Sequence, residues 1–372
     1  MMGAGGRGPG AGKQGPGARG RGPGRAGICL LVGLLALSGC GGYADFKLPP
    51  VSGGDAAMTF AFEAQAEPVL TGGDGWESHD VLNPSVISEP RPRPADPAGT
   101  PPGPWPLALL YSGFDGRTWR TGLAVSEDGT HWQKQGVILS PDRRTWEGSY
   151  IAANGSALFH ENQFWYWYQA GPRERPRIGL ARAVDTRSWR KEPKPVLEPG
   201  PYGSWDEYGV ADPYVVRIEP YFYLFYLGQD RARRQRLGVA RSKEGVRWEK
   251  LRSNPVLELG DAGAFDENGL GEPAVWNSHG FYWMIYTGRD TKENRRLGLA
   301  RSTDGVHWGK LAVVFGGGQP WDAKVVCDPT VEVAAGVIRV WFGGGDVASP
   351  DENLHGKIGM AILRPVRAGL AH

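Results

Sequence analysis

A fivefold repeat constrains the fold of this chain more than any other feature of the sequence. Each copy begins with an aromatic residue followed by an acid, and seven or eight residues later it reaches a polar residue that we call the pivot. The starting pairs are Trp76-Glu77, Trp146-Glu147, Trp205-Asp206, Phe265-Asp266 and Trp321-Asp322, and the pivots are Asn83, Asn154, Asp212, Glu272 and Asp328. Proline follows every pivot except Asn154, which is followed by glycine.

Each copy continues with three further short segments typical of strands. An aromatic run such as YFYLFYLG is followed by a Gly-Leu-Ala-like run, and the first four copies then reach a tryptophan and a short apolar run. Apolar residues alternate along these segments, and β-branched and aromatic residues are enriched, which indicates strands. Four-stranded units repeated at this period are typical of propeller blades. We therefore predict an all-β fold, a five-bladed β-propeller of four-stranded antiparallel blades, over residues 58–365.

The ends of the repeat predict how the ring closes. The fifth copy stops near residue 363 without its tryptophan strand, whereas the segment FEAQAEPVL at residues 62–70 has the spacing of that missing strand. Phe62 stands where the tryptophan would be. We therefore expect the N-terminal strand to complete the last blade, which would protect an otherwise exposed sheet edge.

The N-terminus is predicted to be an export signal. Residues 1–27 are rich in Gly, Pro and Arg and contain no acid, residues 28–37 are apolar, and Leu37-Ser38-Gly39-Cys40 follows. The apolar run is too short to span a bilayer comfortably and ends in small residues, as a cleaved signal does. The alternative to a lipoprotein signal is an ordinary signal peptide with a chance cysteine.

The four residues ending at Cys40 resemble the lipobox of bacterial lipoproteins. The resemblance implies cleavage before Cys40 and a lipid on its sulfur, with residues 1–39 as signal peptide and 40–57 as lipidated cysteine and tether. At the other end of the predicted propeller, residues 366–372 are expected to be a tail. It also implies a lipid-anchored protein of the cell envelope. Because Gly41 rather than Asp follows the cysteine, the sorting rule of these lipoproteins favours the outer membrane.

Charge and cysteine content exclude some classes of partner. The formal charge is +2, but five of the 42 basic residues lie in the first 27, which leaves 37 basic against 40 acidic residues in the rest. A weakly acidic body gives no electrostatic reason to expect nucleic acid as a partner. Once Cys29 and Cys40 are assigned to the export segment, Cys327 has no cysteine to pair with, so we expect it to be a small buried apolar residue. Through the anchor, the expected partner is a membrane, and we expect a monomer.

The pivots are the candidate functional residues. The first strand of each propeller blade lines the central channel, so all five pivots should converge there. Carboxylates held close together raise one another's pKa and tend to mark functional sites. The alternative is that a polar residue followed by proline only caps a strand. The pivots differ chemically, however, since three are acidic and one of these is Glu.

This pattern resembles the furanosidase superfamily, glycoside hydrolase families 43, 32 and 68, over nearly all of residues 58–365. In family 43 a general-base Asp lies on blade 1, a second Asp that orients the site lies two blades later, and the general-acid Glu lies one blade further. The matching positions are Asn83, Asp212 and Glu272. The resemblance implies a glycosidase of furanosidase or xylosidase type, with Glu272 as general acid and Asp212 holding the pKa of Glu272 up.

Asn83 departs from this pattern because it cannot take a proton from water, as the base of an inverting glycosidase must. Three alternatives stay open. Another acid could supply the base, and the candidates nearby in sequence are Asp74, Glu77, Asp80, Asp115 and Glu147. The protein could be an inverting phosphorylase, since the Asn-Pro start resembles family 130, although the Asp-Pro-Arg signature of that family is absent. It could also bind glycan without cleaving it, or serve as a scaffold for an envelope complex.

The other site assignments follow from position. We expect Asn83, Asn154, Asp328, Trp76 and Trp205 to bind substrate, although packing between blades is an alternative for the two tryptophans. No cofactor is expected, and a Ca²⁺ ion on the axis is the one option, because three carboxylates and an amide oxygen suit a hard cation. Four loop residues could reach a cleft or could simply be solvated: Arg117, Arg231, Arg289 and His79. The segments at 126–132 and 302–308 resemble the Asp-box of sialidases, a structural turn.

Overall fold

The computed structural model describes residues 42–88, 107–186 and 188–367. The chain divides into two parts, Met1–Gly39 and Cys40–His372, and all described residues belong to the second. The predicted signal peptide and Cys40 therefore lie outside the described residues. Within the described ranges, no helix is both long and apolar enough to cross a membrane.

The described residues form an all-β fold with short 3-10 turns at η1 (Gly75–Glu77) and η2 (Pro320–Asp322). Its strands group into antiparallel four-stranded units, numbered 1 to 5 in chain order, that follow the sequence repeat. Unit 1 comprises β3 (Asp80–Ser88), β4 (Leu107–Phe114), β5 (Trp119–Ser126) and β6 (Gln133–Leu139). Unit 2 comprises β7 (Ile151–His160), β8 (Gln163–Gly171), β9 (Arg177–Ala183) and β10 (Arg190–Lys191). Unit 3 comprises β11 (Gly209–Ile218), β12 (Tyr221–Gln229), β13 (Gln235–Ser242) and β14 (Glu249–Leu251).

The last two units have the same strand order along the chain, except that unit 5 takes its fourth strand from the N-terminal side. Unit 4 comprises β15 (Gly269–Ser278), β16 (Phe281–Arg289), β17 (Arg295–Ser302) and β18 (Gly309–Phe315). Unit 5 comprises β19 (Val325–Ala334), β20 (Val337–Gly345), β21 (Lys357–Arg367) and β2 (Met58–Ala64). The strand β21 runs past the predicted domain boundary at residue 365.

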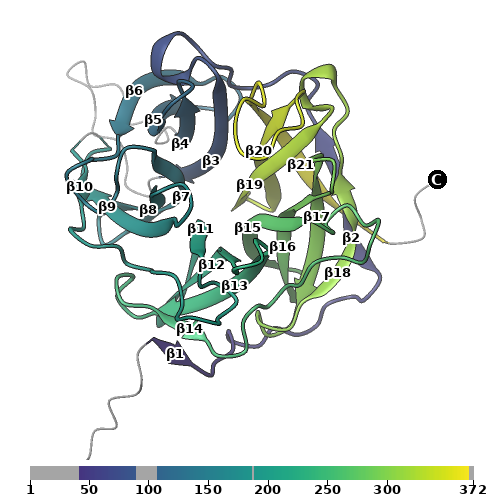
Figure 1. Cartoon of the computed structure of the whole chain (residues 1–372). Helices are drawn as coiled ribbons and strands as arrows, with labels where there is room; N and C mark the ends of the chain where they lie inside the picture. The colour runs from purple at the N-terminus through teal and green to yellow at the C-terminus, as the bar shows by residue number, and fades with distance from the viewer. Residues whose placement is uncertain (1–41, 89–106, 187, 368–372) are drawn as a thin grey trace, which may run out of the picture. The chain divides into compact units, whose positions relative to one another are not determined.

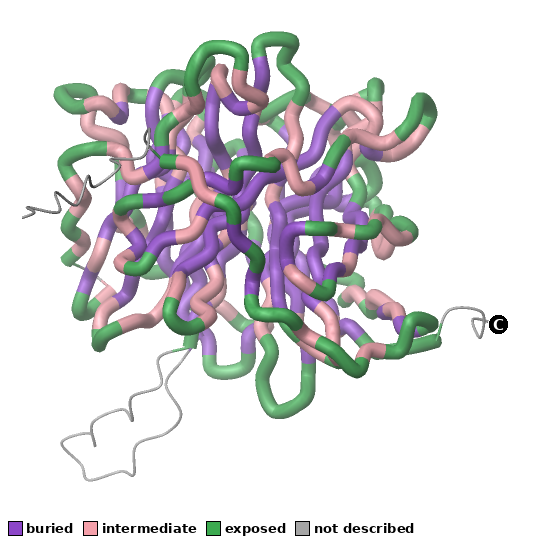
Figure 2. The backbone as a smooth tube through the Cα atoms, turned by 90° about the horizontal axis from the view of Figure 1, so that it is seen from below, coloured by how far each residue is buried: buried purple, intermediate pink, exposed green. Residues whose placement is uncertain are grey.

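The units are arranged around a central space, with the first strand of each unit nearest the centre (Figure 1). These first strands contact one another in a closed circle, from β3 to β7, β11, β15 and β19 and back to β3. Buried positions are concentrated along the strands, and exposed positions lie in the connecting loops (Figure 2). The loops at one end of this circle are therefore free to vary while the packed strands hold them in place.

The predicted pairing of the N-terminal strand with the last unit is observed. β2 pairs antiparallel with β21, from Met58 opposite Arg367 to Ala64 opposite Ala361. The strand begins at Met58 rather than at Phe62, because the alternating buried positions start there. Phe62 stacks on Phe315 of unit 4 with ring centroids 4.6 Å apart, so the strand also joins neighbouring units.

The stretch predicted to be a tether is packed against the body over its described residues. β1 (Tyr43–Ala44) adds a parallel strand to β14 of unit 3. Phe46 and Leu48 are buried, and the Leu48 N–H donates to the carbonyl of Asp304 in unit 4 at 2.9 Å. This differs from the prediction, because apolar side chains such as these gain more from burial than from a solvated linker.

The acids of the repeated aromatic–acidic pairs hold the outer strand of their unit. In unit 3, Asp206 is buried and accepts hydrogen bonds from Lys250 of β14 at 2.5 Å and from Tyr226 of β12 at 3.1 Å. An acid bonded to a lysine and a tyrosine occurs in three other units, with Glu in place of Asp in units 1 and 2: Glu77 with Lys134 and Tyr111, Glu147 with Lys191 and Tyr168, and Asp266 with Lys310 and Tyr286. A buried carboxylate needs such partners, so these acids are structural.

The aromatic residues of the pairs in units 1, 3, 4 and 5 pack on glycines of their own unit. A Cβ atom on Gly228 or Gly238 would come within 2.3 or 2.4 Å of the ring of Trp205. Trp76 lies in the same way against Gly113 and Gly122. The glycines therefore recur in the repeat because a side chain there would collide with the ring. These contacts make Trp76 and Trp205 packing residues, although the rings pack within their own units rather than between blades.

Candidate active site

The backbone of the five pivots has one unusual conformation. Each pivot has a positive φ, between 45° and 53°, and the strand pairing shifts register immediately after each of them. Such a β-bulge inserts an extra residue and re-aims a side chain. The left-handed region costs a non-glycine residue about 1 kcal/mol or more, so it persists only where surrounding structure enforces it.

The residue after each pivot fits this bulge. Proline lacks an N–H, so it is tolerated where the ladder bond is already lost. Unit 2 carries Gly155 instead, because a Cβ atom there would lie 2.3 Å from the carbonyl oxygen of Trp167 and 2.5 Å from the ring of Tyr166. The departure of the second copy from the repeat therefore has a steric cause.

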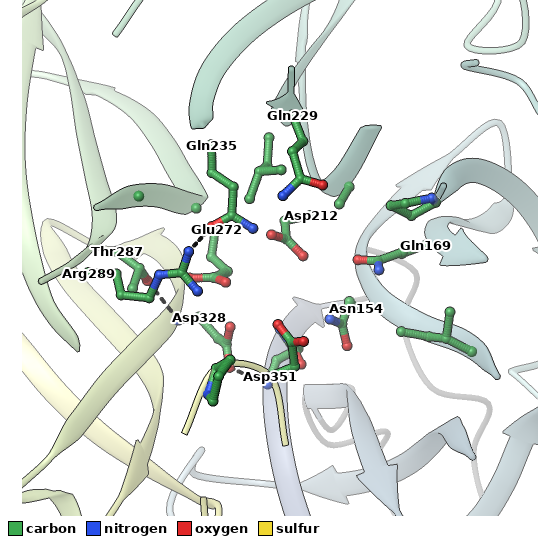
Figure 3. A pocket seen from close by; sticks show the side chains of 18 of the residues that line it. Asn154, Gln169, Asp212, Gln229, Gln235, Glu272, Thr287, Arg289, Asp328 and Asp351 are labelled. Carbon is green, nitrogen blue, oxygen red and sulfur yellow. Dashed lines mark hydrogen bonds between the residues drawn. The ribbon is translucent and has the colours of Figure 1, made fainter. Parts of the chain in front are cut away.

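The pivots form the floor of a cavity of about 380 Å³ at the centre of the circle of units. All five pivots line this cavity. Together with the residues that follow them in the sequence, they also line a second space of only about 30 Å³. The walls come from the ends of the second strands and the starts of the third strands (Figure 3). The larger volume lies in the usual range for small-molecule sites.

Three carboxylates on this floor share an electrostatic environment. Burial raises the pKa of Asp212 well above its usual value, and the charges of Glu272 and Asp328 raise it further, while a hydrogen bond from Asn154 lowers it. Burial and the charge of Glu272 raise the pKa of Asp328 to about 7. Because coupled acids titrate as a group, this cluster retains a proton near neutral pH.

The backbone N–H of Asn83 and the thiol of Cys327 both donate to Oδ2 of Asp328, at 3.2 and 3.1 Å. They stabilise its charged form and partly oppose the effect of burial. Cys327 is buried, as its sequence predicts, and contacts the site rather than another cysteine. The contact with Asn83 brings the carboxylate of unit 5 beside the position where the family pattern expects the base.

Polar atoms without partners mark where a ligand would bind. Oε2 of Glu272, Oε1 of Gln169 and Nε of Arg289 are buried and make no hydrogen bond to any described residue, and all three side chains line the cavity. Buried polar atoms are rarely left unpaired in proteins. Two acceptors and one donor suit a ligand that carries several hydroxyl groups.

The acids that were alternative bases are engaged elsewhere. The carboxylate of Asp80 accepts backbone N–H groups of Asn353, Leu354 and Gly356 at 2.6 to 2.9 Å. Asp115 pairs with Arg120, and the paired Glu77 and Glu147 are described above. None of these, nor the exposed Asp74, lines the cavity among the described residues. The hypothesis that one of them supplies the base is therefore not supported.

Arginines and amides of the cavity wall were only partly found from the sequence. Of the four loop residues that could reach a cleft, Arg289 lines the cavity, whereas Arg117, Arg231 and His79 do not. Arg295 was missed; it lines the cavity, is half-buried and donates to the carbonyl of Ser349 at 3.2 Å. Gln169 and Gln229 were also missed; they lie at the ends of second strands or next to them, as Arg289 does. Aligning those positions across the copies could have identified them.

The predicted site residues divide into two groups. Asn83, Asn154, Asp212, Glu272 and Asp328 come together at the cavity, from five different strands. Trp76 and Trp205 do not line it in the described structure, because they pack on glycines of their own units. In that part of the chain, no group of three or more His, Cys, Asp and Glu side chains is placed to hold a metal, so the suggested Ca²⁺ finds no ligand set there.

Comparison with solved structures gives the class of fold. A structure described as a glycoside hydrolase aligns with a TM-score of 0.64 at 18% identity, covering 84% of this chain and 95% of that one. One from the GH130 family of mannoside phosphorylases, which contains glycoside hydrolases that target β-1,2 mannosidic linkages in Candida mannan, aligns with a TM-score of 0.62 at 18% identity over 86% and 96%. A family 117 glycoside hydrolase of Zobellia galactanivorans aligns with a TM-score of 0.57 at 16% identity over 83% and 92%. The fold is that of propeller glycosidases.

The sequence itself then gives the family. Residues 112–327, more than half of the chain, match the glycosyl hydrolases family 32 N-terminal domain, and the protein belongs to that family. It is 30% identical over 226 residues to the uncharacterized protein Rv1502 of Mycobacterium tuberculosis, covering 57% of this chain and 75% of that protein. It is 28% identical over 135 residues to a 1,2-beta-oligomannan phosphorylase of a Thermoanaerobacter species, covering 34% and 45%.

Proposed function

We propose that this protein is a glycosidase that hydrolyses an oligosaccharide in the central cavity, with Glu272 as general acid. The observation that carries the proposal is the buried, unpartnered Oε2 of Glu272 in a cavity whose acid cluster holds a proton near neutral pH. A general acid must present a proton to the oxygen of the leaving group. The membership in a glycosyl hydrolase family supports this reaction class.

The other cluster residues take supporting roles in this proposal. Asp212, whose pKa is raised by burial and by the charge of Glu272, holds a proton within the cluster, while Asn154 orients Asp212. Asn83 binds a sugar hydroxyl or the reacting water. Asp328 takes the place of the missing base, because its pKa of about 7 suits proton abstraction near neutral pH and its carboxylate lies against the Asn83 backbone.

Hydrolysis of aryl arabinosides, xylosides, mannosides and fructosides by the wild type and by Glu272→Gln tests the proposal. We expect at least one substrate to be cleaved, and the variant to lose about 10²- to 10⁴-fold in kcat. The acid assignment fails if the variant cleaves as fast as the wild type. If the wild type cleaves nothing but retains oligosaccharides, the protein is a glycan-binding protein instead.

Phosphorolysis is the second candidate. It is favoured by the relative named as a 1,2-beta-oligomannan phosphorylase and by the arginines of the cavity wall, which are suited to an anion. Phosphate is itself a nucleophile, so a phosphorylase needs no base. Adding inorganic phosphate to the same assays separates the two: a phosphorylase releases a sugar 1-phosphate and stops when phosphate is removed.

The finer description of the fold belongs to the same proposal. We take each four-stranded unit as one blade of a five-bladed propeller whose last blade is closed by β2. The closed circle of contacts among first strands and the pairing of β2 with β21 support it. A map of hydrogen exchange protection should then show protected amides in β2 comparable to those in β21.

We further propose that Cys40 carries a lipid and anchors a monomeric protein to the cell envelope, in the outer membrane. The sequence pattern ending at Cys40 supports it, and the packed stretch from residue 43 onward implies that the body lies close to the anchor. Replacement Cys40→Ser should release the protein from the membrane fraction. An unchanged distribution between membrane and soluble fractions would contradict the anchor.

A further inference from the structure

Two loops beside the cavity share one backbone design. The loops before β11 and β15 each carry a glycine whose N–H donates to a glutamate four residues on, Gly203 to Glu207 at 2.8 Å and Gly263 to Glu267 at 2.7 Å. The turns that follow β12 and β16 also match, because each is closed by a backbone hydrogen bond. The N–H of Asp230 donates to the carbonyl of Arg234 at 3.2 Å in unit 3, and the N–H of Asp290 donates to the carbonyl of Asn294 at 3.1 Å in unit 4. Both loops begin at the cavity end of their unit.

The side chains on this shared backbone differ. The positions in unit 3 are Tyr202, Tyr208, Arg231 and Arg233, and the equivalent positions in unit 4 are Ala262, Asn268, Thr291 and Glu293. Since unit 4 forms the same loop without them, the tyrosines and arginines of unit 3 are not needed to build it. Large side chains that a fold does not need and that face solvent indicate a binding role.

In unit 3 the two tyrosines are fixed by the two arginines. The guanidinium of Arg231 lies 4.2 Å from the ring centroid of Tyr202 and donates to its hydroxyl at 3.0 Å. The ring of Tyr202 is still 82% exposed. Arg233 stacks at 4.0 Å on Tyr208 and donates to its hydroxyl at 2.8 Å. A ring held in place in this way loses little conformational entropy when a ligand packs on it.

This pair of stacks is continuous with the cavity. Arg233 lines the cavity wall, and Arg231 lies in the same turn, two residues before it. The carboxylate of Glu207 pairs with Arg231 at 3.4 Å, so donors and an acceptor surround the exposed ring. A flat amphipathic ring bordered by such groups matches a sugar, which has an apolar C–H face and a rim of hydroxyls.

We propose that Tyr202, Tyr208, Arg231 and Arg233 form an outer subsite that holds further sugar units of an oligosaccharide whose end lies in the cavity. The inference rests on the proposed function only in that the cavity takes carbohydrate, not in which residue is the acid. The ligand class is therefore an oligosaccharide of three or more units, with its chain directed over unit 3.

Binding of glycans of different length tests the subsite. The probe is an array of plant and microbial oligosaccharides in which each tetrasaccharide is matched by its disaccharide, read with wild type, Tyr202→Ala and, as matched control, Ala262→Tyr in unit 4. We expect the wild type to bind at least one tetrasaccharide about tenfold more tightly than its disaccharide, a difference of about 1.4 kcal/mol. Tyr202→Ala should remove that difference, and Ala262→Tyr should leave it unchanged.

The proposal is overturned if the wild type retains no oligosaccharide, if chain length makes no difference, or if Tyr202→Ala preserves the preference. Loss of binding to disaccharides as well would also overturn it, since the cavity alone should bind those. Cleavage of small aryl glycosides reports on the cavity separately. If these are cleaved while length has no effect, only the outer subsite fails; if they are not cleaved while Tyr202→Ala removes a length preference, only the proposed hydrolysis fails.

Discussion

Units 3 and 4 are built in the same way, and their differences separate scaffold from function. Both hold their outer strand by a buried aspartate bonded to a lysine and a tyrosine, Asp206 with Lys250 and Asp266 with Lys310. Both have the same bulge at the pivot and the same loop backbone. They differ where side chains face the cavity and its rim. The repeat therefore supplies the framework, and a few substitutions on it supply the chemistry.

The pivots show this division at the level of one methylene group. Asp212 of unit 3 accepts a hydrogen bond from Asn154, whereas Oε2 of Glu272 in unit 4 is unpartnered among the described residues. Both backbones are in the left-handed region, at φ 47° and 45°. The longer side chain on the same backbone therefore leaves an oxygen available to a ligand, which is why we assign the acid role to Glu272.

Making the pivot of unit 4 like that of unit 3 should have the largest effect. Glu272→Asp withdraws the carboxyl from the leaving group, so we expect kcat to fall about 10²- to 10⁴-fold. Steady-state kinetics on the aryl glycoside that the wild type cleaves would measure it. Thermal unfolding serves as the control and should change little. Retained kcat would show that the length of the side chain is irrelevant and would remove the distinction between the two pivots.

The structural ion pairs should differ in strength between the two units. Lys250 is 7% exposed and Lys310 is 27% exposed, so removing the acid leaves a more deeply buried charge in unit 3. We expect Asp206→Ala to lower the free energy of unfolding by about 3–5 kcal/mol. Asp266→Ala should lower the free energy of unfolding by less, because water can reach Lys310. Urea unfolding of both variants would measure the difference, and equal losses would contradict it.

The acid cluster predicts that stability falls as the pH rises. The pKa of Asp328 is about 7 in the folded protein and close to 3.8 when unfolded, so between these values the folded state holds a proton that the unfolded state has released. This contribution is present below pH 3.8 and is lost as pH rises through 7. Three pKa units correspond to at most about 4 kcal/mol, and we expect about 2.

Asp328→Asn tests this pH dependence, because asparagine keeps an acceptor but does not titrate. Urea unfolding at pH 5 and pH 8 should show a smaller loss of stability between the two values than in the wild type. The matched change Glu272→Gln in unit 4 should weaken the pH dependence only in part, because the charge of Glu272 adds to the effect of burial on the pKa of Asp328. If the free energy of unfolding changes equally with pH in the wild type and in Asp328→Asn, the pKa of Asp328 is not raised in the folded protein.

Exchanging the rim side chains should have the smallest effect on stability. Tyr202→Ala and Ala262→Tyr each change an exposed position on a loop whose backbone does not depend on it. We expect both to alter the free energy of unfolding by less than about 0.5 kcal/mol. Thermal and urea unfolding would measure this. A loss of 2 kcal/mol in Tyr202→Ala would mean that the tyrosine supports the loop of unit 3 and would weaken its proposed binding role.

Much of the architecture was predictable because it is repeated. Alternation and turn signals gave the strands, and the incomplete fifth copy gave the pairing of β2 with β21. The convergence of the pivots also followed, since the same position in each copy must lie at the same radius. The start of β2 and the packing of residues 42–57 were not predicted, because single apolar side chains such as Phe46 and Leu48 show no period in the sequence.

The site was only partly predictable for a different reason. The roles expected for Trp76 and Trp205 depended on whether an aromatic ring faces the cavity or its own sheet, and only the contact with glycines of neighbouring strands decides that. Glu77, Asp80 and Glu147 looked available as bases because their partners are distant in sequence. Hydrogen bonds to residues such as Asn353 and Lys191 are tertiary, and a sequence pattern does not report them.

The sequence by itself determined the repeat, the strand order and the five positions that meet at the centre, because each follows from spacing along the chain. The tertiary structure alone decided which of those positions are buried together, how far the pKa of Asp328 is raised, and which oxygen of Glu272 has no partner among the described residues. It also stacked the arginines of unit 3 on its tyrosines, with Arg233 at the cavity wall. Burial and charge coupling arise only when distant strands come together, so no local pattern can encode their size.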